Sequence, residues 1–366
     1  MGGTPKGPTY WDYLRVPELL SLQGGLEKDE SALAPDELHF IIVHQVYELW
    51  FKLCLRELRV VRDHLAAPKV PEEAIAHVVH HLGRVGKVLH LLVEQFTVME
   101  TLTPQDFLAF RDKLTPASGF QSHQLREIEV LLGLGDEQRV AYGSTHALAH
   151  LESMAKGSTS GSAMWGRLET ARGEESVRQA LHRWLSRTPI QGSGPDDPDD
   201  AKVVRKFLDD YLASVRTHQR AQLARTTNAD PAVVEKRFEE EAKSVERFLF
   251  ALDVPEADRQ ATIRIRAALV FIESYRELPL LAWPRLLLDS IVEVEEQFVL
   301  WRHRHARMVE RVIGRRVGTG GSSGVDYLDQ TARMRVFPEL WSVRTLLLPR
   351  TEVPKLVHPE VYGFAR

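Results

Sequence analysis

Apolar residues recur at three- and four-residue steps along most of the chain, which is the period of an α-helix that buries one face. Alternating runs of β-branched residues bounded by hairpin turns do not occur in the sequence. The pattern therefore predicts an all-α fold, a bundle of helices whose apolar faces pack against one another.

Start signals, turn residues and prolines divide this pattern into helices. Pro35-Asp36 offers a cap before one long apolar stripe, and Gly133 is placed to stop another helix after Leu132. The expected helices, with approximate bounds, cover residues 36–64, 71–92, 103–111, 120–132, 201–218, 231–252, 256–278 and 284–314.

Two polar breaks rich in glycine and proline interrupt the middle of the chain. They are KGSTSGS (156–162) and TPIQGSGPDDPDD (188–200), and the helical pieces that they flank are less regular. We therefore expect an N-terminal arm with core helices at 1–133, a peripheral insertion at 134–200, and further core helices at 201–366.

Composition narrows the class of protein. The net charge of −4, from 47 basic and 51 acidic residues, gives no overall field for nucleic acid or an anionic membrane. The single cysteine, Cys54, excludes an intramolecular disulfide and a thiolate metal cluster, and fits a reducing cytoplasm. No secretory signal is apparent, and Pro284 and Arg285 interrupt the most apolar stretch, so we expect neither export nor a membrane span.

Two histidines lie on apolar faces of different predicted helices. His305 follows Trp301 on the buried stripe of the 284–314 helix, whereas His303 lies about 200° around that helix on its polar side. His44 lies on the inward face of the 36–64 helix, one turn after Phe40. A single inward histidine is more often a hydrogen-bonded core residue than a ligand, but two of them favour a shared site.

The residues alone leave the chemistry of such a site open. Zinc needs three or four ligands, and the pairs His77-x-x-His80 and His146-x-x-x-His150 lack an evident third partner. A b-type haem needs one axial imidazole, and without Cys-x-x-Cys-His it cannot be covalently attached. Aromatic surroundings suit a porphyrin and an ordinary core equally well, so both interpretations stand.

Two further segments bear on whether the chain binds a small ligand, and only the first suits an anion. Arg111 ends the 103–111 helix on the side of Phe107, and Ser118 follows at a turn; this suits a carboxylate, although such an arginine more often forms a surface salt bridge. The segment GTGGSSG (318–324) carries Thr319 but lacks the Gly-Lys-Ser/Thr ending of a phosphate loop. Its glycines indicate a mobile lid or a tight backbone path.

Longer blocks of the chain resemble the tryptophan 2,3-dioxygenase family in both sequence and order. The blocks are TYWDYLRVPELLSLQ (9–23), DELHFIIVHQVYELWFKLCLREL (36–58), ETLTPQDFLAFRDKLTPASGFQSHQLREIEVLLG (100–133), EEQFVLWRHRHARMVERVIGRRVGTGGSSGVDYL (295–328) and FPELWSVRT (337–345). Residues 134–260 match poorly. On these blocks the chain is identified as a member of the family.

The resemblance implies a helical haem protein and assigns roles to individual residues. His305 corresponds to the proximal ligand of haem b, with Trp301 beside it, and the distal pocket then lies in segment 1–133. His44 corresponds to the distal histidine that accepts a hydrogen bond from the indole N–H of the substrate. The other residues that correspond to substrate contacts are Phe40, Phe107, Arg111 for the carboxylate, Ser118, and Thr319 in the lid.

The resemblance also implies a partner chain and a reaction. Tyr10, Tyr13 and Leu14 correspond to a segment that reaches into a neighbouring subunit's active site, so a homotetramer is expected. The implied substrates are L-tryptophan and dioxygen, which the kynurenine pathway joins as N-formylkynurenine by opening the C2–C3 bond of the indole.

Three departures from the family pattern keep two other functions open. Phe107 stands where a tyrosine is usual, Phe96 where a tryptophan is usual, and Val46-Tyr47 replaces a smaller pair. A pocket altered in this way would suit a monooxygenase of secondary metabolism that makes an oxindole from tryptophan or methyltryptophan. The third hypothesis is a non-catalytic sensor of haem or tryptophan, which would not need Arg111 and Thr319 together with both histidines.

Overall fold

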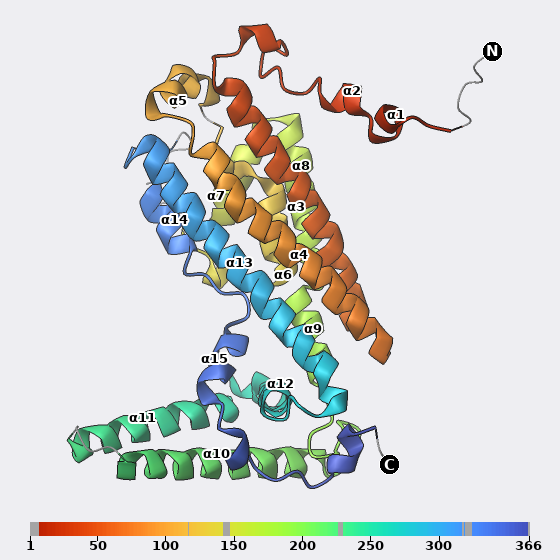
Figure 1. Ribbon diagram of the computed structural model, residues 1–366, viewed down its shortest axis with the longest axis vertical. Coiled ribbons are helices and arrows are strands. Elements are labelled where there is room, and N and C mark those ends of the chain that lie inside the picture. Colours follow the sequence, from red (N-terminus) through yellow and green to blue (C-terminus); the bar gives the residue numbers. More distant parts are fainter. Residues whose placement is uncertain are drawn as a thin grey trace.

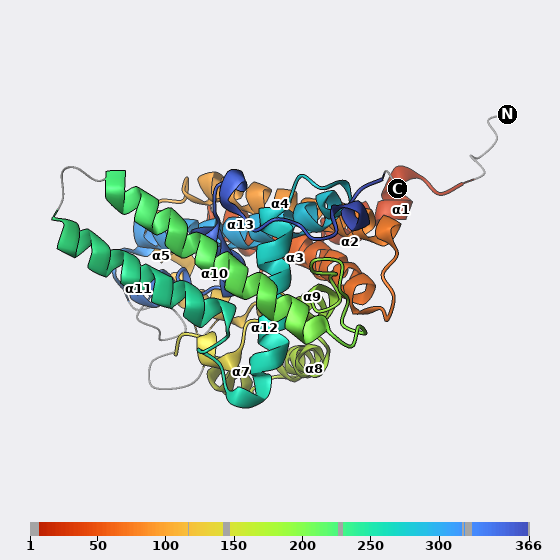
Figure 2. The same cartoon turned by 90° about the horizontal axis from the view of Figure 1, so that it is seen from below.

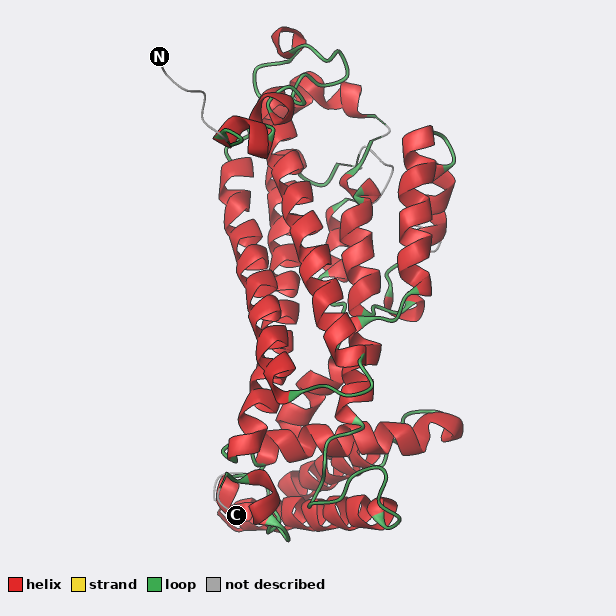
Figure 3. Ribbon diagram, turned by 90° about the vertical axis from the view of Figure 1, so that its right-hand side faces the viewer, coloured by secondary structure: helices red, strands yellow, loops and turns green. Residues whose placement is uncertain are grey.

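The computed structural model describes residues 7–115, 117–141, 147–225, 230–316, 318 and 324–364. Within these ranges the chain forms helices and turns, and the only extended pairing is an isolated bridge between Ile190 and Ser193 (Figure 3). The all-α fold expected from the apolar period is confirmed. No helix in this part of the chain is long and apolar enough to cross a membrane.

Three long helices form the core of the bundle. They are α3 (Glu37–Ala66), α4 (Glu72–Met99) and α13 (Ala282–Ile313), and α4 packs against both of the others (Figure 1). Leu58, Leu92 and Phe298 lie on the facing stripes and are almost completely buried. Burying these stripes removes apolar surface from water, which is the main stabilising contribution to such a bundle.

Short helices carry the site residues of segment 100–133. They are α5 (Pro104–Phe110), η2 (Arg111–Leu114), η3 (Gly119–Gln121) and α6 (His123–Leu132). Helix α5 lies at one end of the bundle, whereas α6 packs along α3 (Figure 1). Thr103 and Ser122 cap α5 and α6 by accepting backbone N–H groups. Gly133 ends α6 with a φ of 111°, and a Cβ at this position would come within 2.8 Å of Arg178, so glycine is required here.

The helices of segment 134–200 pack into two different apolar clusters. Helices α7 (Ala147–Ala155) and α8 (Thr159–Gly173) contribute to a small separate apolar cluster, with Leu148 and Leu168 at its centre. Helix α9 (Val177–Leu185) instead packs against α3, and Val177 and Leu181 are completely buried in the main core. The domain boundaries remain a prediction, but α9 is a core helix rather than part of a peripheral insertion.

A second layer of helices closes the other end of the bundle. Helices α10 (Asp200–Arg225) and α11 (Pro231–Leu249) run side by side across that end, and α12 (Glu256–Ser274) connects them to the core (Figure 2). The chain then returns through α13, α14 (Val325–Thr331) and α15 (Pro338–Leu346). The helices expected at 36–64, 201–218 and 284–314 are confirmed, with bounds that agree within two residues except that α10 continues to Arg225.

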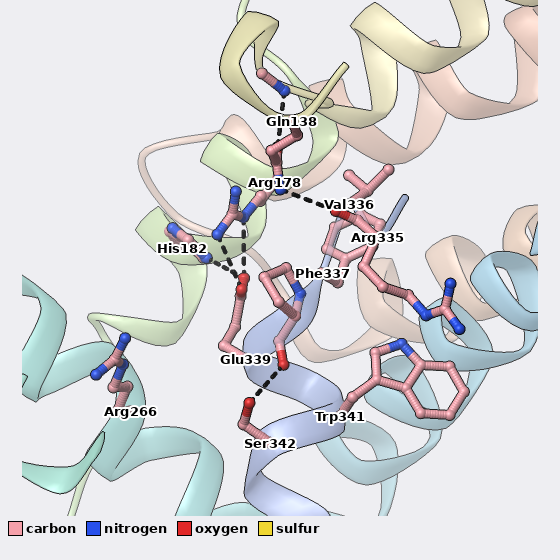
Figure 4. A network of polar contacts seen from close by, with 12 residues as sticks. Gln138, Arg178, His182, Arg266, Arg335, Val336, Phe337, Glu339, Trp341 and Ser342 are labelled. Atoms are coloured by element: carbon pink, nitrogen blue, oxygen red, sulfur yellow. Dashed lines mark hydrogen bonds and ion pairs between the residues drawn. The ribbon is translucent and has the colours of Figure 1, made fainter. Parts of the chain in front are cut away.

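Glu339 ties α15 to α9, as Figure 4 shows. Its carboxylate accepts hydrogen bonds from Arg178, at 3.1 and 2.9 Å, and from Nε2 of His182 at 2.6 Å. Burial raises the pKa of Glu339, but the bonds from His182 and Arg178 outweigh it and lower the pKa to about 2. This ionised cluster joins α15 to the core helix α9.

Candidate functional site

His305 is held among aromatic rings on the buried face of α13. Its ring lies 5.8 Å from that of Phe96, nearly parallel at 14°, and 5.1 Å from that of Trp301. Burial, followed by the charges of His44 and Arg126, lowers the pKa of His305 to about 4. The imidazole is therefore neutral near pH 7 and keeps a lone pair on one ring nitrogen.

Neither ring nitrogen of His305 makes a hydrogen bond to another residue in the described ranges. A metal-ligating histidine usually donates its second N–H to an acceptor, and the sequence left that acceptor unassigned. His303 is exposed and lies on the polar side of α13, away from the buried face that carries His305, as the helical period predicted.

A hydrogen bond determines which ring nitrogen of His44 carries the proton. Its Nδ1 lies 2.7 Å from the backbone oxygen of Phe40, and because a carbonyl can only accept, this nitrogen carries the proton. Nε2 is then left as a hydrogen-bond acceptor. The Phe40 ring packs against the His44 ring at 4.0 Å between centroids.

The surroundings of His44 keep it neutral and connect it to His305. Solvent reaches the His44 side chain, yet protein surrounds much of the ring. This burial lowers the pKa of His44, and its effect is larger than that of the Phe40 carbonyl and nearby Glu48, which raise the pKa. His44 is also close enough to His305 to affect the pKa of that residue. The two histidines that the sequence placed on separate helices therefore lie in the same region of the bundle.

Phenylalanine side chains from two elements extend this site. Phe107 of α5 is 7% exposed and packs at 5.9 Å from Phe40 and 5.4 Å from Phe110. Tyr47, one turn after His44, is buried among the rings of Phe96 and Trp301, and its hydroxyl donates to the backbone oxygen of Leu92 at 2.9 Å. The Tyr47 hydroxyl is therefore satisfied within the core.

Arg111 and Ser118 lie at the same end of the bundle as Phe107. Arg111 is partly buried at the junction of α5 and η2, one turn after Phe107. Ser118 caps η3, because its Oγ accepts the backbone N–H of Phe120 at 3.3 Å. Thr319, expected in the lid, lies outside the described residues.

The N-terminal arm projects from the body of the molecule (Figure 1). Helix α1 (Tyr10–Leu14) leaves Tyr10 72%, Tyr13 78% and Leu14 47% exposed, an unusual amount of apolar surface for a short segment, and α2 (Val16–Leu19) follows it. Sequence reasoning missed how the arm is attached. Gln45, beside His44, donates to the Leu22 backbone oxygen at 2.9 Å and accepts from Gln23 at 2.7 Å.

A buried charge cluster that sequence reasoning also missed lies behind the site. The Glu129 carboxylate contacts Arg126 at 2.9 Å, Arg139 at 2.7 Å and Arg302 at 3.0 Å. Burial raises the pKa of Glu129, but the three guanidinium groups outweigh it and lower the pKa to about 2. The only available signal was the presence of charged residues on the buried face of a short helix.

Two N–H groups near His305 are buried without a hydrogen-bond partner in the described part of the chain. They are Nε1 of Trp301 and Nε of Arg126. An unpaired buried donor costs free energy, and a bound ligand with an acceptor group would satisfy these two.

Comparisons with known proteins agree on one family. A family model described as tryptophan 2,3-dioxygenase matches residues 3–347. The chain is 50% identical over 369 residues to tryptophan 2,3-dioxygenase 2 of Ralstonia nicotianae, which covers 98% of each protein. It is 50% identical over 368 residues to the tryptophan 2,3-dioxygenase of Sorangium cellulosum (98% of this chain, 88% of that protein). It is also 33% identical over 362 residues to that of Dictyostelium discoideum (96% and 86%).

Proposed function

Because the chain belongs to the tryptophan 2,3-dioxygenase family, we propose that it is an enzyme that inserts both atoms of dioxygen across the indole C2–C3 bond of L-tryptophan, giving N-formylkynurenine. The observation that carries this proposal is the pair of neutral histidines. His305 makes no hydrogen bond to another described residue, and His44 has its proton fixed on Nδ1, which leaves Nε2 as an acceptor. The oxindole and sensor alternatives are not favoured, since the relatives at 50% identity bear the dioxygenase name.

The family depends on haem, and the residues around His305 fit that group. A porphyrin needs one unprotonated axial imidazole, apolar contacts, and donors for its carboxylates. His305, the rings of Phe96 and Trp301, and the buried N–H groups of Trp301 and Arg126 match these requirements in turn. His305 would hold the iron of haem b, with Trp301 beside it.

Haem supplies, when bound, the iron chemistry that activates dioxygen, and the protein supplies position and surroundings. Nε2 of His44 accepts the indole N–H, which orients the ring without requiring proton transfer. Phe40 and Phe107 provide apolar contact for the indole. Arg111 pairs with the substrate carboxylate, with the turn at Ser118 and the Thr319 segment completing the amino-acid contacts.

The assignment of His44 as an orienting acceptor leads to a specific expectation. In His44→Ala the KM for tryptophan should rise about two- to tenfold, the value of one neutral hydrogen bond, with kcat changing less. Because burial keeps the pKa of His44 below its usual value of about 6.5, any rise in KM on acidification of the unmodified protein should be centred below pH 6.5. Steady-state kinetics would test both, with exposed His303→Ala as the control; a large loss of kcat with unchanged KM would contradict the orienting role.

A homotetramer located in the cytoplasm is part of the same proposal. The exposed side chains of Tyr10, Trp11 and Tyr13 would be covered by a neighbouring subunit, where the arm reaches the site. Burial raises the pKa of the Cys54 thiol to about 12, so this single cysteine is inert and needs no oxidising compartment.

The reaction itself is tested by the mass of the product. Haem-loaded, reduced protein should convert tryptophan under ¹⁸O₂ into N-formylkynurenine that carries both labelled atoms. One labelled atom in an oxindole would indicate the monooxygenase, and haem binding without any product would indicate a sensor. Failure to give a Soret band after haem supplementation would overturn the enzymatic proposal altogether.

A further inference from the structure

Four histidines gather at the turn between α3 and α4, far from the candidate site. They are His64 near the end of α3 and His77, His80 and His81 in the first turns of α4. His64 lies twenty residues after His44 on a continuous helix, which separates the two by about 30 Å at 1.5 Å per residue. The substrate site makes no use of this cluster.

The closest pair in this cluster is His77 and His81. Their Nε2 atoms lie 3.0 Å apart, and their rings are 4.5 Å apart at 75°. The sequence suggested His77 with His80, but residues four apart lie on the same helix face, and Nε2 of His80 faces Arg84 at 2.9 Å instead. His64 packs edge-on against His77 at 5.3 Å.

The other nitrogen of His81 is fixed by a buried carboxylate. Nδ1 of His81 bonds to Glu57, and Arg84 donates to both oxygens of the same carboxylate at 2.9 Å. Since the carboxylate accepts, Nδ1 of His81 carries the proton and Nε2 keeps its lone pair, directed toward His77. A carboxylate behind a histidine is the usual way in which proteins orient a metal ligand.

The spacing of the two Nε2 atoms matches adjacent ligand positions around a metal ion. With metal–nitrogen distances of about 2.0–2.1 Å, a separation of 3.0 Å corresponds to an angle of roughly 90–95° at the metal. This is the angle between neighbouring ligands in square-planar and octahedral complexes, which Cu²⁺ and Ni²⁺ prefer.

We propose that His77 and His81 chelate a divalent transition-metal ion of the Ni²⁺ and Cu²⁺ class, with Glu57 orienting His81. Within the described ranges no three His, Cys, Asp or Glu side chains are arranged to hold a metal ion, so water fills the other coordination positions. Binding requires only that the neutral ring of His77, an exposed residue, carry its proton on Nδ1 instead of Nε2. The site joins two successive turns at the start of α4.

Calorimetric titration with NiCl₂ tests this site in haem-loaded protein purified without a histidine tag. We expect one equivalent of Ni²⁺ to bind without changing the Soret band, and His77→Ala to abolish that binding. His80→Ala is the matched control, because it removes an exposed histidine from the same helix and should leave the affinity unchanged. His77 is itself exposed, so its removal should not disturb folding.

Glu57→Gln tests the role assigned to the carboxylate. It should weaken Ni²⁺ binding by about tenfold or more, as expected for loss of the group that orients a metal ligand. Absence of saturable Ni²⁺ binding would overturn the proposal, as would binding that survives His77→Ala or that shifts the Soret band. If no saturable Ni²⁺ binding is found, the imidazoles of His77 and His81 form only a hydrogen-bonded pair.

Discussion

Replacing His305 with alanine is expected to abolish stable haem binding and, with it, tryptophan turnover. His305 has its pKa lowered to about 4 and is not hydrogen-bonded to another described residue, so its lone pair is available at any pH above about 4. No other imidazole lies against Phe96 and Trp301 in the described part of the chain. Alanine removes the ligand but leaves the helix intact, because it is the best helix-forming residue.

The Soret absorbance of the purified variant, before and after haem supplementation, measures this effect. His303→Ala provides the matched control, since it removes an exposed imidazole two residues away on the same helix. Circular dichroism should report the same helix content for both variants. A His305→Ala protein with an unchanged Soret band would disprove the ligand assignment.

Replacing Glu129 with glutamine is expected to destabilise the fold by about 3–5 kcal/mol, the usual result of removing one partner from a buried ion pair. Glu129 is 1% exposed and compensates the charges of Arg126, Arg139 and Arg302, which are themselves almost completely buried. Glutamine keeps the size of the side chain but leaves three buried guanidinium groups without their shared counter-charge.

Urea unfolding at several pH values measures this contribution and its sign. Folding lowers the pKa of Glu129 to about 2, so its contribution is fully present above an unfolded pKa of about 4.3 and is lost as pH falls toward 2. The difference in free energy of unfolding between the unmodified protein and Glu129→Gln should therefore be constant above pH 5 and shrink below pH 4. Exposed Glu137→Gln should have little effect on stability, and an equally small effect of Glu129→Gln would contradict the prediction.

Solvent reaches the side chain of His44, which periodicity placed on an inward face. Periodicity alone predicted the helical fold and the position of His305 on the apolar stripe of α13. Both follow from local rules, because the apolar stripe of a helix fixes the direction of every side chain along it. The stripe that contains Trp301 and His305 could thus be identified without knowing what packs on it. The roles of the two histidines, by contrast, came from the family resemblance.

What the sequence could not predict depends on contacts between distant segments. Nothing in the local sequence marks Glu129 and Arg302 as partners, and only the folding of the chain brings them together as a buried ion pair. The sequence pattern placed helix α9 in a peripheral insertion because polar breaks flank it, although α3 covers its apolar face. Gln45 offered no local signal that it would hold the base of the arm.

The packing of α13 on α4 has a consequence for the order in which the protein matures. The ribosome completes α3 and α4 long before it makes α13, yet these helices form the core only together. Until then the apolar face of α4 that meets α13 stays uncovered, and chaperones can bind it during this period. Because the proposed haem ligand His305 lies on α13, the nascent chain would acquire it only after α3 and α4 have been made, and haem could not bind there earlier.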